Sequence, residues 1–221
     1  MMTKMKNTKA NDEELIMMLG QQGQQNGLIR TIPVQINNHL IFVDDDIGDP
    51  ALYRDVIHCL ATCNENDGVN FLINSNGGRT DSIWQIIEAM KGCRGDVCAT
   101  VIGSAYSAAS MLACMAPECL IADSAEFMLH TAHYGSIGTV PNVKGQTDFA
   151  TKQINRLLDI CYAGFLTPKE LEELKNGREW WFDADEARER MAKRQLYLHK
   201  EHLKSVKARN KRPAAAAKTT E

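Results

Sequence analysis

Two short segments of the chain carry a hydroxyl and an imidazole at positions that favour nucleophilic catalysis. Ser110 lies near the end of a run of small residues at 103–111, and His130 closes the apolar run at 127–129. A serine hydroxyl becomes a good nucleophile when a neighbouring base takes its proton, and histidine often serves as that base. The pair therefore predicts a hydrolase with Ser110 as nucleophile and His130 as base.

Neighbouring residues of the same types leave this assignment open. Ser104 and Ser107 lie in the same run as Ser110, and His133 follows His130 within the next loop. We favour His130 because it directly follows an apolar run that reads as a strand. The structural alternatives are a satisfied core histidine and small residues that merely permit tight helix packing. The sequence alone does not decide among the three serines.

A glycine pair supplies the backbone that such an enzyme needs. Gly77 and Gly78 end the segment at residues 74–78, directly after another apolar run. Glycine adopts positive φ and lets the backbone approach a substrate closely. Backbone N–H groups and a helix N-terminus stabilise the negative charge that develops on a substrate oxygen. We therefore expect an oxyanion hole with the amide of Met111 as one candidate donor and the Gly77-Gly78 turn as a suitable source of the second.

A carboxylate is the third group that a serine hydrolase uses, because it orients the imidazole and stabilises its cation. The candidates are Asp123, Glu126, Asp148, Glu179 and Asp183. Glu179 stands beside Trp180 and just before a helix-start signal, and a carboxylate buried there needs a partner. Arg178 is one such partner, which would make Glu179 structural.

Strands alternate with helices along the chain, and this order predicts an α/β fold with a mainly parallel sheet. Predicted strands cover residues 39–43, 69–73, 97–102, 119–122 and 127–130, and predicted helices cover residues 50–63, 81–90, 108–115 and 148–163, with two more that start near residues 168 and 184. Ligands of such sheets bind beyond the carboxyl ends of the strands. The glycine turn, the serine run and His130 can therefore share one edge.

Length and composition permit one well-buried domain with extensions at both ends. We expect a flexible arm at residues 1–28, a folded domain at residues 29–192, and a charged helical extension with a disordered tail at residues 193–221. The net charge of −3 argues against nucleic acid as the main partner.

Seven cysteines occur without any CxxC pair, which is typical of reduced, buried thiols in a cytoplasmic protein. Cys59 and Cys63 stand four residues apart and would share the apolar face of a predicted helix. Neither the aspartates at 44–46 nor the pair His199 and His202 has further ligands at metal-binding spacing, so we expect no metal. No apolar run approaches the roughly 20 residues of a membrane span, so we expect a cytoplasmic protein without a membrane partner.

These motifs together resemble the proteolytic subunit of the Clp protease (ClpP), and more closely its phage- and prophage-encoded relatives. Residues 74–78, Asn-Ser-Asn-Gly-Gly, are similar to the family's Asn-Ser-Pro-Gly-Gly loop, and residues 103–110 are similar to the Gly-x-Ala-x-Ser-Ala-Ala-Ser motif of the phage branch. Residues 127–130 resemble the family's Met-Ile-His, and residues 178–187 resemble the segment that carries its acidic triad member. The similarity covers roughly residues 29–191.

The resemblance implies a serine endopeptidase of the ATP-dependent Clp protease type with a crotonase-like α/β spiral. It implies that Ser110 is the nucleophile, His130 the base and Glu179 the acid, with Gly78 and Met111 as oxyanion donors. It implies no cofactor.

The resemblance also implies a quaternary structure and partners. Residues 131–163 would form a protruding handle by which heptameric rings stack. Unfolded polypeptide, or the scaffold protein of a capsid, would be hydrolysed inside the enclosed chamber, with an AAA+ unfoldase as a partner. The alternatives are a non-catalytic ring or virion assembly subunit of the same fold, and an enzyme of this fold that acts on acyl-CoA thioesters.

Overall fold

The computed structural model describes residues 36–210. Its elements are β1 (Asn38–Val43), η1 (Pro50–Tyr53), α2 (Arg54–Thr62), β2 (Gly68–Ser75), α3 (Thr80–Gly92), β3 (Asp96–Tyr106), α4 (Ala108–Met115), β4 (Glu118–Ile121), β5 (Glu126–Leu129), α5 (Val140–Tyr162), α6 (Pro168–Lys175), β6 (Trp180–Phe182) and α7 (Ala184–Asn210). The predicted arm at residues 1–28 and the last residues of the predicted tail lie outside the described residues.

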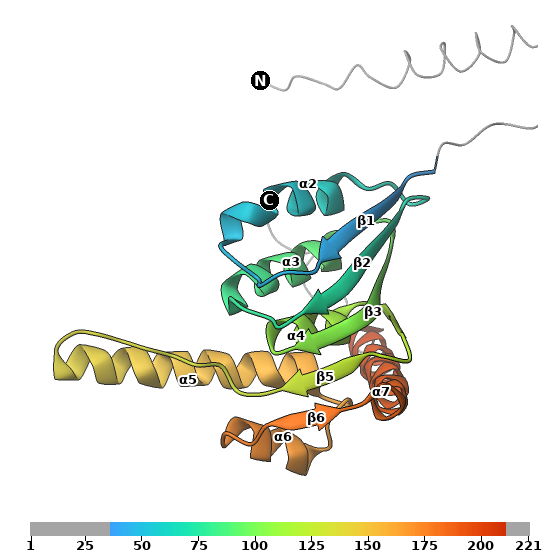
Figure 1. Cartoon of the computed structure of the whole chain (residues 1–221). Helices are drawn as coiled ribbons and strands as arrows, with labels where there is room; N and C mark the ends of the chain where they lie inside the picture. Colours follow the sequence, from blue (N-terminus) through green and yellow to red (C-terminus); the bar gives the residue numbers. More distant parts are fainter. Residues whose placement is uncertain (1–35, 211–221) are drawn as a thin grey trace, which may run out of the picture. The chain divides into compact units, whose positions relative to one another are not determined.

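A mixed sheet of six strands organises the described part of the chain, in the order β1-β2-β3-β5-β6 with β4 also paired to β3 (Figure 1). All pairs are parallel except β5 with β6. This confirms the predicted α/β fold with a mainly parallel sheet. Strand β6 was not predicted, because a three-residue strand is too short to show an alternating pattern.

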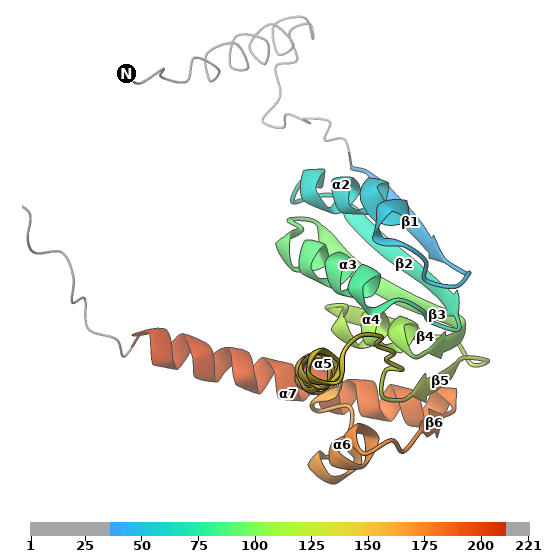
Figure 2. The same ribbon diagram turned by 90° about the vertical axis from the view of Figure 1, so that its left-hand side faces the viewer.

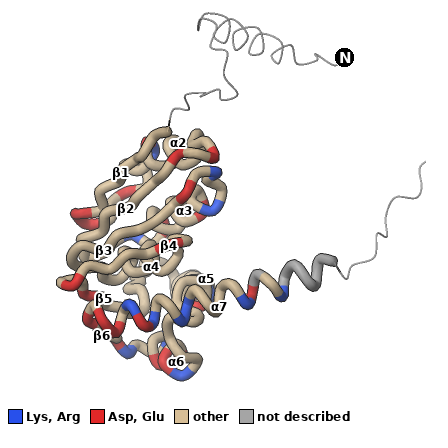
Figure 3. Tube along the Cα trace, turned by 90° about the vertical axis from the view of Figure 1, so that its right-hand side faces the viewer, with Lys and Arg blue, Asp and Glu red and all other residues tan. Residues whose placement is uncertain are grey.

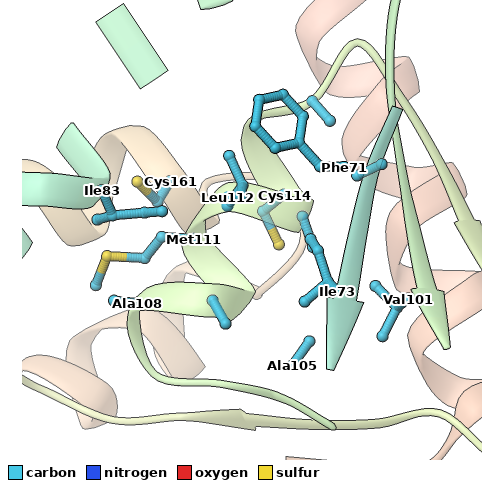
Figure 4. Packing of buried hydrophobic residues seen from close by; sticks show 14 of the residues in the cluster. Phe71, Ile73, Ile83, Val101, Ala105, Ala108, Met111, Leu112, Cys114 and Cys161 are labelled. Carbon is cyan, nitrogen blue, oxygen red and sulfur yellow. The ribbon is translucent and has the colours of Figure 1, made fainter. Parts of the chain in front are cut away.

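Helices α2, α3 and α4 line up along one face of the sheet (Figure 2). Alternate residues of β2 point to that face, so Phe71 and Ile73 are fully buried. Every residue of α4 from Ala108 to Cys114 is buried, as expected of a helix that is covered on all sides. Figure 4 shows this helix in the core, with Met111 on the side of Ile83 and Cys161, and strand residues such as Phe71 and Ile73 on its other side. The buried helix gives the turn before it a rigid support.

Helix α5 begins at Val140, earlier than the predicted start at residue 148. Pro141 and Gly145 weaken the helix signal in the sequence before residue 148. Proline is tolerated in the first turn of a helix, where its missing N–H would have no partner. Only Leu158, Cys161 and Tyr162 of α5 are buried, and the rest of the helix extends away from the sheet (Figure 1).

The two predicted helix starts near the C-terminus are confirmed. Thr167 and Glu170 form the reciprocal capping box that opens α6, and the Asp183 carboxylate accepts from the amide of Glu186 at 2.9 Å in the first turn of α7. Acidic and basic residues both occur along α7 (Figure 3). None of the helices within residues 36–210 is both long enough and apolar enough to cross a membrane.

A fully buried arginine on α7, Arg194, joins the ends of α4 and α5. Its guanidinium donates to the carbonyls of Cys114 at 2.6 Å, Ala163 at 2.6 Å and Ile160 at 3.1 Å. These carbonyls lie at helix C-termini, where the backbone dipoles favour a cation. Arg194 thereby holds α4 against α5.

Candidate active site

Ser107 occupies a sharp turn between strand β3 and helix α4. Its backbone has φ 54° and ψ −120°, and it is the one residue other than glycine with positive φ within residues 36–210. Such a backbone conformation costs of order 1–3 kcal/mol of folding free energy. It persists only where the surrounding structure holds the backbone in place. A strained strand–turn–helix junction of this kind exposes a serine hydroxyl at the top of the sheet in many hydrolases.

His130 follows strand β5, the parallel neighbour of β3, and its side chain reaches the hydroxyl of this turn. The distance from His130 Nε2 to Ser107 Oγ is 2.7 Å, which is a short hydrogen bond. The imidazole is partly buried. Burial lowers the pKa of His130, as does the neighbouring ring of His133, whereas Glu179 raises it. A lowered pKa keeps the imidazole neutral at neutral pH, as a base requires.

Ser110 does not lie against His130, contrary to the expectation from the sequence. It lies one helical turn further along, inside α4, and is 0% exposed. Its hydroxyl donates to the Ser107 carbonyl at 2.6 Å and shares a hydrogen bond of 2.7 Å with the hydroxyl of Tyr162. Because burial raises the pKa of Tyr162, that phenol stays neutral. Through this hydrogen bond, Ser110 holds the Ser107 carbonyl, and with it the backbone of the turn, from the buried side.

The Met111 amide is also not placed as expected. It donates to the Ser107 carbonyl at 3.3 Å as part of helix α4, and its side chain is buried. The physical reason is that the helix begins at Ala108, as predicted, so the amide of Met111 lies inside the helix and its hydrogen bond is already made within it. Ala108 is the first residue of the helix, where an N–H has no partner within the helix.

The glycine loop packs directly against the turn at Ser107. Gly77 has φ +94°, and a Cβ at this position would lie 2.5 Å from the Tyr106 carbonyl oxygen and 2.9 Å from the amide nitrogen of Ala108. No side chain fits at this distance. Gly78 forms a parallel bridge with Ile47. In this bridge the Ile47 amide donates to the Gly77 carbonyl, and the Arg79 amide donates to the Ile47 carbonyl. The Gly78 N–H therefore points away from Ile47.

A cleft of about 990 Å³ opens at this edge of the sheet, and Gly78, Ser107, His130 and His133 are among the residues that line it. The side chain of His133 is exposed, and its ring centroid lies 5.2 Å from that of His130 in an edge-to-face arrangement. His133 thus stands beside the base, and the Ser107 hydroxyl is bonded to His130.

Glu179 lies at the end of the cross-strand register that β6 forms with β5. Leu129 and Trp180 are the last pair of this antiparallel ladder, so His130 and Glu179 each lie one residue beyond it. The electrostatic effect of Glu179 on His130 agrees with this placement. Arg178 pairs with Glu173 at 2.7 Å, so the predicted alternative partner is engaged elsewhere.

The other candidate carboxylates have different surroundings. Asp123 pairs with Arg188, Glu126 accepts from the Tyr106 hydroxyl, and Asp183 caps α7. Asp148 is exposed on α5. Of the five candidates, Glu179 is the carboxylate that acts electrostatically on His130.

Two features of the site had a signal in the sequence that sequence reasoning did not use. Ser107 directly precedes the predicted helix at residues 108–115 and follows the predicted strand at 97–102, so it stands at the strand-to-helix junction. The same boundary makes Ala108 the first helical amide. Tyr162 lies 52 positions from Ser110, and no sequence signal indicated that the two residues meet.

Comparison with known proteins assigns the chain to a family. The family model described as Clp protease matches residues 18–190, which is more than half of the chain. The match spans the glycine loop, the turn at Ser107, His130 and Glu179. A comparison with curated proteins found no match. Members of the matched family are serine peptidases, and the chain belongs to the Clp protease family.

Proposed function

We propose that this protein is a serine endopeptidase in which Ser107 is the nucleophile, in place of Ser110. The observation that carries the proposal is the 2.7 Å contact between His130 Nε2 and Ser107 Oγ at a strained turn. A nucleophile and its base within hydrogen-bond reach form the core of a catalytic triad.

In the proposed reaction, Ser107 Oγ attacks the scissile carbonyl while His130 Nε2 accepts the hydroxyl proton. The oxyanion receives hydrogen bonds from the amides of Gly78 and Ala108. His130 then gives its proton to the leaving amine, and the amide bond breaks to leave an ester on Ser107. Water, activated by the same imidazole, hydrolyses that ester. Glu179 would orient the imidazole from its Nδ1 side.

The substrate that this site suits best is an extended polypeptide. The cleft is open at the edge of the sheet and lined in part by backbone, including Gly78 and Gly135. Backbone groups of this kind pair with an extended peptide with little regard to side chains. We therefore propose loose specificity for unfolded or scaffold polypeptides.

We further propose that the sites face a chamber made by stacked rings of this chain, fed by an AAA+ unfoldase. Support comes from the segment proposed as the handle, residues 131–163, where Ile137 is 100% exposed, Val140 83% and Phe149 64%. Large apolar side chains gathered on one projecting segment favour contact with another protein surface. The Ser-Ala-Ala-Ser run at residues 107–110 supports a place in the phage- and prophage-encoded branch.

The two alternatives predict different behaviour. An enzyme that acts on acyl-CoA thioesters gives the contact between Ser107 and His130 no joint role. A non-catalytic ring or assembly subunit would not need the strained backbone at Ser107. That strain would lower its stability and serve no function.

The test uses a fluorophosphonate that labels activated serines, followed by peptide mapping and by digestion of fluorescent casein. We expect the label on Ser107, and a loss of at least about 10³-fold in cleavage for Ser107→Ala. Ser110→Ala is the matched control: it should keep the label and cleave casein, with lower stability because buried hydrogen bonds are lost. Light scattering checks that both variants assemble like the wild type. Label on Ser110, or full activity in Ser107→Ala, would refute the proposal.

A further inference from the structure

A group of metal-binding side chains lies at the opposite edge of the sheet from the proposed active site. His39 comes from the start of β1, and Cys59 and Cys63 come from the last turn and the C-cap of α2. One ligand atom from each of the three residues lies within 4.8 Å of the others. The spacing of four residues along α2 turns both cysteines to one side of the helix.

A fourth side chain, Cys93, completes the group. It is the C-cap residue of α3, and both its thiol and that of Cys59 act electrostatically on the thiol of Cys63. The C-terminal ends of α2 and α3 thus meet at the beginning of β1. Two helix C-termini bring partial negative charge to the same place, which favours a cation.

We propose that His39, Cys59, Cys63 and Cys93 bind one zinc ion. Three thiolates and one imidazole are a common ligand set of structural zinc sites, which are tetrahedral. Bonds of about 2.0–2.3 Å to a tetrahedral ion separate its ligands by about 3.3–3.8 Å. His39, Cys59 and Cys63 already lie close to this spacing, and Cys93 would turn towards them as the fourth ligand.

The surroundings of His39 suit a metal ligand. The carboxylate of Asp67 interacts electrostatically with His39 and is itself held by the amides of Asn37 at 3.0 Å and Asn64 at 2.9 Å. Asp67 is buried, with 4% of its surface exposed. A carboxylate behind a metal-binding histidine commonly fixes its ring and raises its basicity.

Other uses of these thiols fit the geometry less well. Cys59, Cys63 and Cys93 are all free thiols, so no disulfide joins them in the structure. Cys63 is buried, with 2% of its surface exposed, which shields it from reagents in solution. A bound ion would instead join β1, α2 and α3, three elements that otherwise meet only by packing.

The test measures metal directly in the full-length protein. The chain is purified, stripped with a chelator, titrated with zinc chloride and, in parallel, with cobalt chloride. We expect one zinc per chain by mass spectrometry of the metal content. We also expect the thiolate-to-cobalt charge-transfer absorption and the intense visible bands of tetrahedral cobalt. Zinc should raise the Tm of the stripped protein by several degrees, because it binds only the folded state.

Two ligand variants and one matched control decide the result. Cys59→Ser and the partly exposed His39→Gln should each weaken zinc binding at least about 10-fold and remove the cobalt charge-transfer signal or change its tetrahedral bands. Cys98→Ser, a partly buried cysteine on β3 outside the group, should behave like the wild type. His39→Gln keeps the test valid if Cys59→Ser fails to fold.

The proposal is overturned by zinc binding that is equal in the wild type and in His39→Gln, or by octahedral cobalt spectra. Loss of two titratable thiols on exposure to air, with a mass lower by two hydrogen atoms, would assign the group to a disulfide and would equally overturn it.

Discussion

His130 Nε2 lies 2.7 Å from Ser107 Oγ, because the two residues follow neighbouring strands that end side by side. Tyr106 pairs with Met128 in the parallel ladder, and the Ser107 amide donates to the Met128 carbonyl at 2.8 Å. These contacts fix the backbone at the ends of β3 and β5, next to Ser107 and His130. Ser110 then holds the Ser107 carbonyl from inside α4, so the two serines have separate roles.

Gly77→Ala should abolish peptidase activity while leaving most of the fold intact. The added Cβ would lie 2.5 Å from the Tyr106 carbonyl oxygen and 2.8 Å from the Ser107 Cβ, at a backbone φ of +94°. The loop must therefore move away from the turn, and a displacement of about 1 Å at a catalytic site costs about 100-fold. Peptide hydrolysis rates and thermal unfolding together check this expectation.

Gly92→Ala is the matched control for that substitution. A Cβ at Gly92 meets nothing within 4 Å, and the residue is the last of helix α3. Alanine there should leave activity unchanged and alter stability by at most about 1 kcal/mol. Equal activity of the two variants would show that the approach of Gly77 to the turn is not required.

His133→Gln should move the acid limb of the pH–rate profile to higher pH. The neutral form of His130 is the base, so activity falls as pH drops through its pKa. Burial is the largest cause that lowers this pKa, and the charge of His133 is the next. Removal of His133 therefore raises the pKa of His130. The profile of kcat/KM for a peptide substrate measures the shift, with the exposed His58→Gln on α2 as control. A shift to lower pH, or an identical shift in the control, would contradict the assignment.

Glu179→Gln should lower kcat and move the same limb in the opposite direction. Glu179 raises the pKa of His130, so its loss lowers that pKa further. Loss of the orienting carboxylate in a serine triad costs up to about 10⁴-fold in kcat. Glu172→Gln, an exposed residue on α6, is the matched control. Glu179→Asp should recover part of the rate. If the role of Glu179 were purely structural, Glu179→Gln would leave the acid limb of the pH–rate profile unchanged.

Local patterns predicted the helices and strands that carry the site, because their signals lie within a few residues. The capping box at Thr167 and Glu170 and the buried, mostly apolar helix α4 are examples. The early start of α5 was missed since Pro141 and Gly145 suppress a helix signal, even though proline is acceptable in a first turn.

The pairing of serine with histidine could not be settled from local patterns. Three serines lie within one run, and the one that reaches His130 depends on where β3 gives way to α4. The contact of Ser110 with Tyr162 joins residues 52 positions apart. The position of Glu179 depends on the register of a three-residue strand, which only tertiary packing determines.

Glu170→Gln should destabilise the protein by about 1–3 kcal/mol near neutral pH. The side chain of Glu170 caps α6 and forms a bidentate pair with Arg190 at 3.0 and 2.8 Å. This pairing, led by the Arg190 hydrogen bonds, lowers the pKa of Glu170 from 4.5 to about 2. Glu170 also accepts the Trp180 indole N–H through its carbonyl at 3.2 Å, so α6 supports the segment around Glu179.

The pH dependence follows from the sign of that shift. A carboxylate with a depressed pKa stabilises the folded state above its unfolded pKa, and the contribution disappears as pH falls through the folded pKa. The stability difference between wild type and Glu170→Gln should therefore be full above pH 4.5 and shrink as the pH falls towards about 2. Urea unfolding across this range measures it, with Glu189→Gln, exposed on α7, as control. A difference that stays constant over the range would mean that the charge of Glu170 does not contribute to stability.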